Sequence, residues 1–161
     1  MKYVAWFMVI LLVLALAGAG YLYASAQVTV ETIGAQAFEA QSQQPTFEDL
    51  KRRLGSGTVI GTVFKNDPLG ESSDYAFITY TVRLRNESLL SADMVEVQIV
   101  PAQGDILQMS GNGIKSLGPK SRGDIGATIL TQRNGDSLRE VIVTYYIWGQ
   151  SFHIKETYKG K

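Results

Sequence analysis

The 161-residue chain contains no cysteine and a single histidine. The absence of cysteine excludes a disulfide framework, a thiolate nucleophile and a cysteine-ligated zinc site. A single histidine cannot build a multi-histidine metal site. Neither charge is in excess, because 15 Lys and Arg residues balance 15 Asp and Glu residues. A protein that follows the phosphate backbone needs a basic surface, so we expect no nucleic-acid partner.

Groups that could carry out catalysis are also scarce. His153 alternates with Phe152 and Ile154, which predicts a position on the wetter face of a strand. A catalytic base needs a partner nucleophile, and no motif supplies one. Gly55-Ser56-Gly57 lacks the spacing of the G-x-S-x-G nucleophile elbow. We therefore expect a protein that is not an enzyme and that binds no cofactor.

One long apolar run is present, over residues 4–22. As a helix it would be about 28 Å long, close to the roughly 30 Å of a bilayer's hydrocarbon core. Aromatic residues at both of its ends suit the two headgroup interfaces: Tyr3, Trp6, Tyr21 and Tyr23. The run predicts a transmembrane signal anchor over residues 1–26, with the lipid bilayer as its partner.

A cleaved signal peptide is the alternative for this segment, because Ala24-Ser25-Ala26 forms an A-x-A cleavage pattern. The apolar run is longer than the usual core of about 7–15 residues in a signal peptide, which favours the anchor. Lys2 precedes the run, and the first basic residue after it is Lys51. Basic residues favour the cytoplasmic side, so we expect a single-pass protein of the cell membrane. Its N-terminus would be cytoplasmic and its C-terminal domain extracytoplasmic.

Two short segments follow the apolar run. Residues 27–44 are polar and rich in Gln and Ala, which predicts a spacer. Alternating residues within it also allow a short first strand: Val28, Val30 and Thr32. Residues 45–56 predict a short amphipathic helix, because three apolar side chains share one helical face: Phe47, Leu50 and Leu54.

From residue 57 to residue 161 the apolar period changes to two. A long strand is predicted over Tyr75–Asn86, and the most β-prone segment is 141–148. The second segment is apolar on both faces, which favours a central strand covered on both sides. Gly149-Gln150 then suits a type II′ hairpin turn. About seven or eight strands without intervening helices predict an all-β fold. We expect an antiparallel immunoglobulin-like β-sandwich over residues 57–161, preceded by the transmembrane helix and the short amphipathic helix.

Three segments carry strand-and-turn motifs. Gly61–Asn66 opens the β region, Tyr80–Ser88 is a strand that ends in Asn and a small polar residue, and Leu117–Ser121 is a Pro-containing turn. Together they resemble exported FxLYD-type and late-embryogenesis-abundant-type immunoglobulin-like domains, with Lys120 where Gly is usual. The resemblance implies a membrane-tethered β-sandwich without catalytic residues.

Three carboxylates lie in one predicted loop: Asp67, Glu71 and Asp74. Calcium prefers oxygen ligands, but the spacing matches no EF-hand loop. A solvated turn is therefore the favoured interpretation, and a calcium site is the alternative. Asn86-Glu87-Ser88 matches the N-x-S glycosylation pattern. A pattern of three residues is also common by chance.

Tyr146 and Trp148 share one face of the predicted strand over residues 141–148. Exposed aromatic side chains on a sheet can stack on a sugar ring or on a partner protein, so these two form a candidate partner surface. Core packing is the favoured alternative, because both faces of this strand are apolar. In that arrangement the 45–56 helix would cover the outer face.

The sequence thus predicts a non-catalytic, membrane-anchored, extracytoplasmic module of the cell envelope. Its role would be binding or structural, with a protein or an envelope polymer as partner. One alternative is a subunit of a pilus-like filament, because pilins also join an apolar N-terminal helix to a β domain. The basic leader and the Gly-plus-Glu processing site of pilins are not found here, which disfavours it. Another alternative is a secreted β-sandwich released by cleavage after Ala26.

Overall fold

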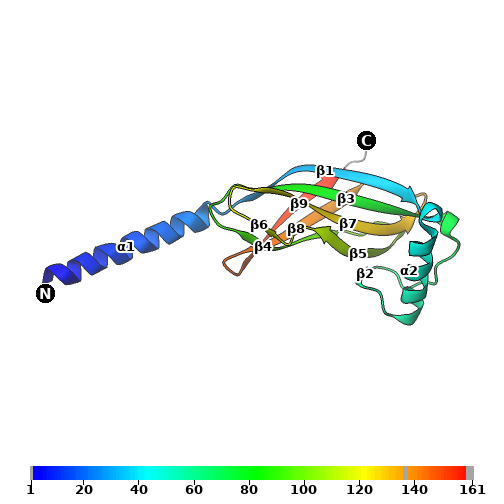
Figure 1. Cartoon of the computed structure of the whole chain (residues 1–161), viewed down its shortest axis with the longest axis horizontal. Coiled ribbons are helices and arrows are strands. Elements are labelled where there is room, and N and C mark those ends of the chain that lie inside the picture. The colour runs from blue at the N-terminus through cyan, green and yellow to red at the C-terminus, as the bar shows by residue number, and fades with distance from the viewer. Residues whose placement is uncertain (1, 136–137, 159–161) are drawn as a thin grey trace.

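A computed structural model describes residues 2–135 and 138–158. Met1 of the predicted anchor and residues 136–137 and 159–161 of the predicted sandwich lie outside the described residues. Figure 1 shows a β-sandwich with helix α1 leading into one end and helix α2 at the opposite end. We name these the α1 end and the α2 end. The elements are α1 (Lys2–Ala24), β1 (Val28–Glu39), η1 (Ala40–Gln43), α2 (Gln44–Ser56), β2 (Gly61–Val63), η2 (Ser72–Asp74), β3 (Tyr75–Asn86), β4 (Ala92–Ile99), β5 (Asp105–Gly113), β6 (Ser116–Leu117), β7 (Arg122–Gln132), β8 (Arg139–Ile147) and β9 (Gln150–Tyr158).

The strands form two antiparallel sheets that pack face to face. The larger sheet has the strand order β1-β3-β7-β5-β2, and the smaller has the order β6-β4-β8-β9. β3, β7 and β8 are central strands, paired on both sides, whereas β1 and β9 are edge strands. This arrangement confirms the predicted antiparallel immunoglobulin-like β-sandwich preceded by an apolar helix.

Strand β1 corrects the predicted domain organisation. The prediction of a spacer over residues 27–44 is wrong, because Val28 to Glu39 pair with β3 along the length of the sheet. Only Val28 of this strand is buried, and its second half is almost entirely exposed. An edge strand that buries so little needs few apolar residues, which is why its polar composition indicated a spacer. The alternation from Val28 to Thr32 indicated the strand correctly but marked only its first half.

The main core lies between the two sheets. Alternate residues of β3 enter it and are completely buried: Tyr80, Val82 and Leu84. The facing side chains of β8 do the same: Val141, Val143, Tyr145 and Ile147. Each large apolar side chain buried in this way contributes roughly 1.5–3 kcal/mol relative to an exposed one. The core therefore fixes where β3 and β8 end, and so it positions the loops at both ends of the sandwich.

Helix α2 forms a second core on the outer face of the larger sheet. The three apolar side chains of its predicted face are buried: Phe47, Leu50 and Leu54. They pack against Tyr75 and Phe77 of β3, and the Phe47 and Tyr75 rings lie 5.5 Å apart. The helix ends at Gly57, whose left-handed backbone (φ 68°) lets the chain turn away. Because α2 covers the larger sheet, the expectation that it covers the outer face of residues 141–148 is wrong.

Candidate functional site

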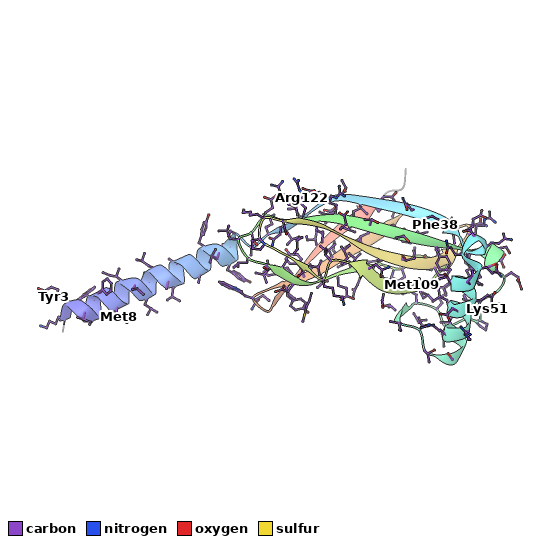
Figure 2. All side chains as sticks on the ribbon, viewed as in Figure 1. Tyr3, Met8, Phe38, Lys51, Met109 and Arg122 are labelled. Carbon is purple, nitrogen blue, oxygen red and sulfur yellow. The ribbon has the colours of Figure 1, made fainter. Side chains whose placement is uncertain are left out.

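Helix α1 has no buried residue and is apolar around its whole circumference. Within the described residues it is the one helix long and apolar enough to cross a membrane. Its length of about 35 Å exceeds the roughly 30 Å of a hydrocarbon core. Figure 2 shows Tyr3 and Met8 on this helix, far from the body of the protein. The helix thus carries a large apolar surface that the rest of the chain does not cover.

The junction between α1 and the sandwich is short and hydrogen-bonded. Ser25 N donates to Tyr21 O at 2.9 Å, which continues the helix past Ala24. Two residues on, the carbonyl of Gln27 accepts a hydrogen bond from Glu87 N at 2.8 Å. The helix also touches the smaller sheet, since the Tyr23 and Phe152 rings lie 6.1 Å apart. The loops at the α1 end are therefore held close to the point where the helix leaves the domain.

The loop between β3 and β4 is fixed by the buried side chain of Asn86. Its Nδ2 atom lies within hydrogen-bonding distance of three carbonyl oxygens: those of Leu90 (2.7 Å), Leu117 (3.1 Å) and Gly118 (3.0 Å). Its Oδ1 atom accepts from Ser88 N at 3.0 Å. The asparagine of the N-x-S motif is therefore used inside the folded protein, where its side chain holds the loop in place. The loop that it shapes carries Leu89, whose side chain is 56% exposed.

The hairpin between β8 and β9 ends the smaller sheet at the α1 end (Figure 1). The last strand pair is Ile147 with Gln150, so the two turn residues are Trp148 and Gly149. Both have positive φ angles, 51° and 74°. This is the pattern of a type I′ turn, so the predicted type II′ turn at Gly149-Gln150 is wrong. The Trp148 side chain is 59% exposed.

Backbone strain gathers at the same end of the molecule. In the described chain three residues other than glycine have a positive φ: Met94 (50°), Lys120 (53°) and Trp148 (51°). Met94 lies in the irregular stretch of β4 beside Tyr146 and is 72% exposed. Lys120 is in the turn between β6 and β7, where its N–H donates to Ser88 O at 3.2 Å. Left-handed backbone is costly for such residues, and it clusters at functional sites.

We name Leu89, Met94 and Trp148 the apolar rim. Each is a large apolar side chain that is more than half exposed, and each comes from a loop, a bulge or a turn at the α1 end. Sequence reasoning found only Trp148, because isolated exposed residues have no periodicity. For Leu89 and Met94 the sequence held no signal, since their exposure depends on the loop and the bulge.

The predicted partner surface is only partly formed. Trp148 is exposed, so core packing is wrong for this residue. Tyr146 is half-buried on the outer face of β8, opposite Ser151. Because the strand ends at Ile147, Trp148 belongs to the turn and does not share a strand face with Tyr146. The two residues therefore do not form one flat aromatic platform.

The other candidates lie elsewhere and do not come together. Asp67, Glu71 and Asp74 are all exposed near the α2 end. Within the described residues, no group of three or more His, Cys, Asp or Glu side chains is arranged to hold a metal ion. The geometry thus gives no support to the calcium alternative. His153 is exposed on β9, opposite Thr144.

Comparisons with known proteins add no functional information. No family model and no curated protein matches the chain. One similar solved structure is the GAE domain of yeast GGA1, with a TM-score of 0.39 and 14% identity over 56% of this chain and 94% of that one. Another is the cupredoxin domain of amoB from Nitrosocaldus yellowstonii, with a TM-score of 0.33 and 15% identity over 79% of this chain and 84% of that one. At these levels of similarity neither says what this chain does.

Proposed function

We propose that the chain is a single-pass membrane protein whose β-sandwich is an extracytoplasmic, non-catalytic module of the cell envelope. The observation that carries the proposal is α1, an apolar helix with no buried residue. Exposing a large apolar side chain to water costs roughly 1.5–3 kcal/mol relative to burying it. A bilayer covers every face of such a helix at once, and the helix is long enough to cross its hydrocarbon core.

The flanking charges support the orientation. Lys2 lies at the start of α1, and the next basic residue is Lys51 on α2. Basic residues are retained on the cytoplasmic side, so the sandwich lies outside the cytoplasm in this proposal. The binding or structural role, with a protein or an envelope polymer as partner, is supported by the scarcity of nucleophile and base motifs described above.

The proposal is tested on the native protein in its own membranes. We expect it to stay with the membrane through high-salt and carbonate washes and to keep its α1 segment when its mass is measured. Protease added to intact spheroplasts should digest the sandwich. A mature N-terminus at Gln27 would show that α1 is cleaved off, which would contradict the anchor and make the sandwich a secreted domain. Protection of the sandwich from protease would reverse the orientation.

A further inference from the structure

We propose that the α1 end of the folded sandwich rests in the headgroup layer of the bilayer that α1 spans, with the apolar rim inserted into the interface. This inference rests on the membrane-spanning role proposed for α1. It adds a second lipid-binding surface, one that belongs to the folded domain and fixes how the domain stands on the membrane.

The length of the junction limits how far the domain can lie from the lipid. Three residues separate Ala24 at the end of α1 from Val28 at the start of β1. Even a fully extended chain would cover only about 14 Å over this distance. The hydrogen bond from Ser25 N to Tyr21 O coils part of the junction and shortens the distance. The loops at the α1 end thus lie at the level where lipid headgroups begin.

The chemistry of the rim suits that level. The amphipathic indole of Trp148 is a side chain that favours the boundary between hydrocarbon and water. The side chains of Leu89 and Met94 are 56% and 72% exposed and offer apolar surface beside it. An isolated exposed apolar residue needs no explanation, but these three share the end from which α1 emerges. A membrane at that end is the one partner that α1 itself brings into place.

The backbone at Trp148 indicates that the side chain is there for a reason other than folding. The first position of a type I′ turn needs a left-handed backbone and favours Asn or Gly. A bulky tryptophan at φ 51° opposes the local backbone preference. Met94, in the irregular stretch of β4, also has a left-handed backbone, with φ 50°. At both positions a residue that accepts left-handed backbone would make the fold more stable. The apolar side chains therefore serve an interaction outside the domain.

Basic and acidic side chains are mixed at this end. Lys115 and Lys120 are exposed there, and so is Asp93, while Glu87 lies in the β3–β4 loop next to them. The Lys120 Nζ group donates to the main-chain carbonyl of Glu87. We therefore expect the contact to depend on the apolar rim and to form on zwitterionic lipid without a requirement for anionic headgroups.

The two tryptophans of the chain allow the proposal to be tested in the full-length protein. Trp6→Phe leaves Trp148 as the only indole, and Trp148→Phe leaves Trp6, which reports on α1 alone. Each variant is reconstituted into phosphatidylcholine vesicles with or without a lipid that carries a doxyl quencher near the headgroup. We expect Trp148 emission to be blue-shifted, strongly quenched by the doxyl lipid and protected from aqueous iodide.

A reporter at the opposite end serves as the matched control. Phe38 is partly exposed at the α2 end (Figure 2). In a chain that carries Trp6→Phe and Trp148→Phe, Phe38→Trp should be quenched by iodide and not by doxyl lipid. A second variant, Leu89→Ser with Met94→Ser, should reduce the doxyl quenching of Trp148 if the rim inserts as a unit.

The outcomes separate the two proposals. Quenching of Trp6 by doxyl lipid without quenching of Trp148 would overturn the lipid-facing rim and leave the anchor intact. Loss of quenching at both tryptophans would overturn the anchor as well. Equal quenching at Trp148 and at the Phe38→Trp reporter would mean that the domain lies flat on the membrane, which also contradicts the proposal.

Discussion

Arg139 and Asp105 form a two-pronged ion pair in the interior of the sandwich. The Arg139 Nε atom donates to Asp105 Oδ2 at 2.9 Å and Nη2 donates to Oδ1 at 2.8 Å, and neither side chain is exposed. Arg139 begins β8 in the smaller sheet and Asp105 begins β5 in the larger one. The pair therefore joins the two sheets at the α2 end. Its bidentate geometry offsets the cost of removing both charges from water.

We expect Asp105→Asn to destabilise the domain by about 3–5 kcal/mol, because it removes the carboxylate that accepts two hydrogen bonds from the buried Arg139 guanidinium. The control is Asp124→Asn, which removes the acid of an exposed bidentate pair with Arg83. The exposed pair is screened by water and salt, so its loss should destabilise the domain far less. Urea unfolding of both variants measures the difference, and equal effects would contradict a special role for the buried pair.

Trp148→Asn should stabilise the fold. The substitution places a residue that accepts left-handed backbone at a turn position where φ is 51°. Relief of this strain is worth about 1–2 kcal/mol. Trp148→Phe keeps the strain and serves as the control, so only the Asn variant should melt at a higher temperature. A lower melting temperature for Trp148→Asn would mean that the indole packs on the domain.

Alkaline pH should destabilise the domain through Tyr80. Burial in the core raises the pKa of its hydroxyl to about 12, with Asp105 and Tyr158 acting in the same direction and Arg139 against it. A tyrosine in the unfolded chain has a pKa of about 10, so the folded state binds the Tyr80 hydroxyl proton more tightly. The stabilisation is complete below about pH 10 and is lost as the pH rises to about 12.

Urea unfolding across this alkaline range measures that loss. Within the described residues the Tyr80 hydroxyl has no hydrogen-bond partner, so Tyr80→Phe should fold normally and flatten the pH dependence. Burial also raises the pKa of Tyr145, and Tyr145→Phe should flatten it further. An unchanged slope in Tyr80→Phe would show that other groups cause the alkaline loss.

Val82→Asp should unfold the sandwich. Val82 is completely buried in the main core, and an unpaired carboxylate there costs several kcal/mol out of a total stability of about 5–15 kcal/mol. Thr81→Asp changes the neighbouring exposed position of the same strand and should be tolerated. Circular dichroism of the two variants measures whether each one is folded. A folded Val82→Asp protein would contradict the assignment of this face to the core.

The sequence predicted the parts of the fold that depend on periodicity. β3 and β8 alternate clearly, because one face of each is packed in the core, and α2 shows its apolar face at helical spacing. The second half of β1 has no such alternation, because an edge strand leaves both faces largely in water. The partner of Arg139 lies 34 residues away in another sheet, and no local pattern links two such positions.

The candidate site was harder to predict for a related reason. Trp148 could be identified as an aromatic residue, but its turn was misplaced by one position because Gly149-Gln150 also suits a hairpin. Met94 depends on an irregularity in the pairing of β4, which forms only when β8 and β6 are in place beside it. Asn86 matched a glycosylation pattern, whereas its side chain is an internal hydrogen-bonding group.

β1 is the strand through which helix α1 is joined to the body of the domain, and this has a mechanical consequence. Val28 pairs with the last residue of β3 at the α1 end, and Glu39 pairs near its beginning at the α2 end. In the proposed membrane-anchored state, a force that pulls the sandwich away from α1 would slide β1 along β3, parallel to both strands. Hydrogen bonds of an antiparallel pair run across the strands, so this shear strains the whole ladder together. The topology thus resists extraction of the tether more strongly than a ladder that could open one pair at a time.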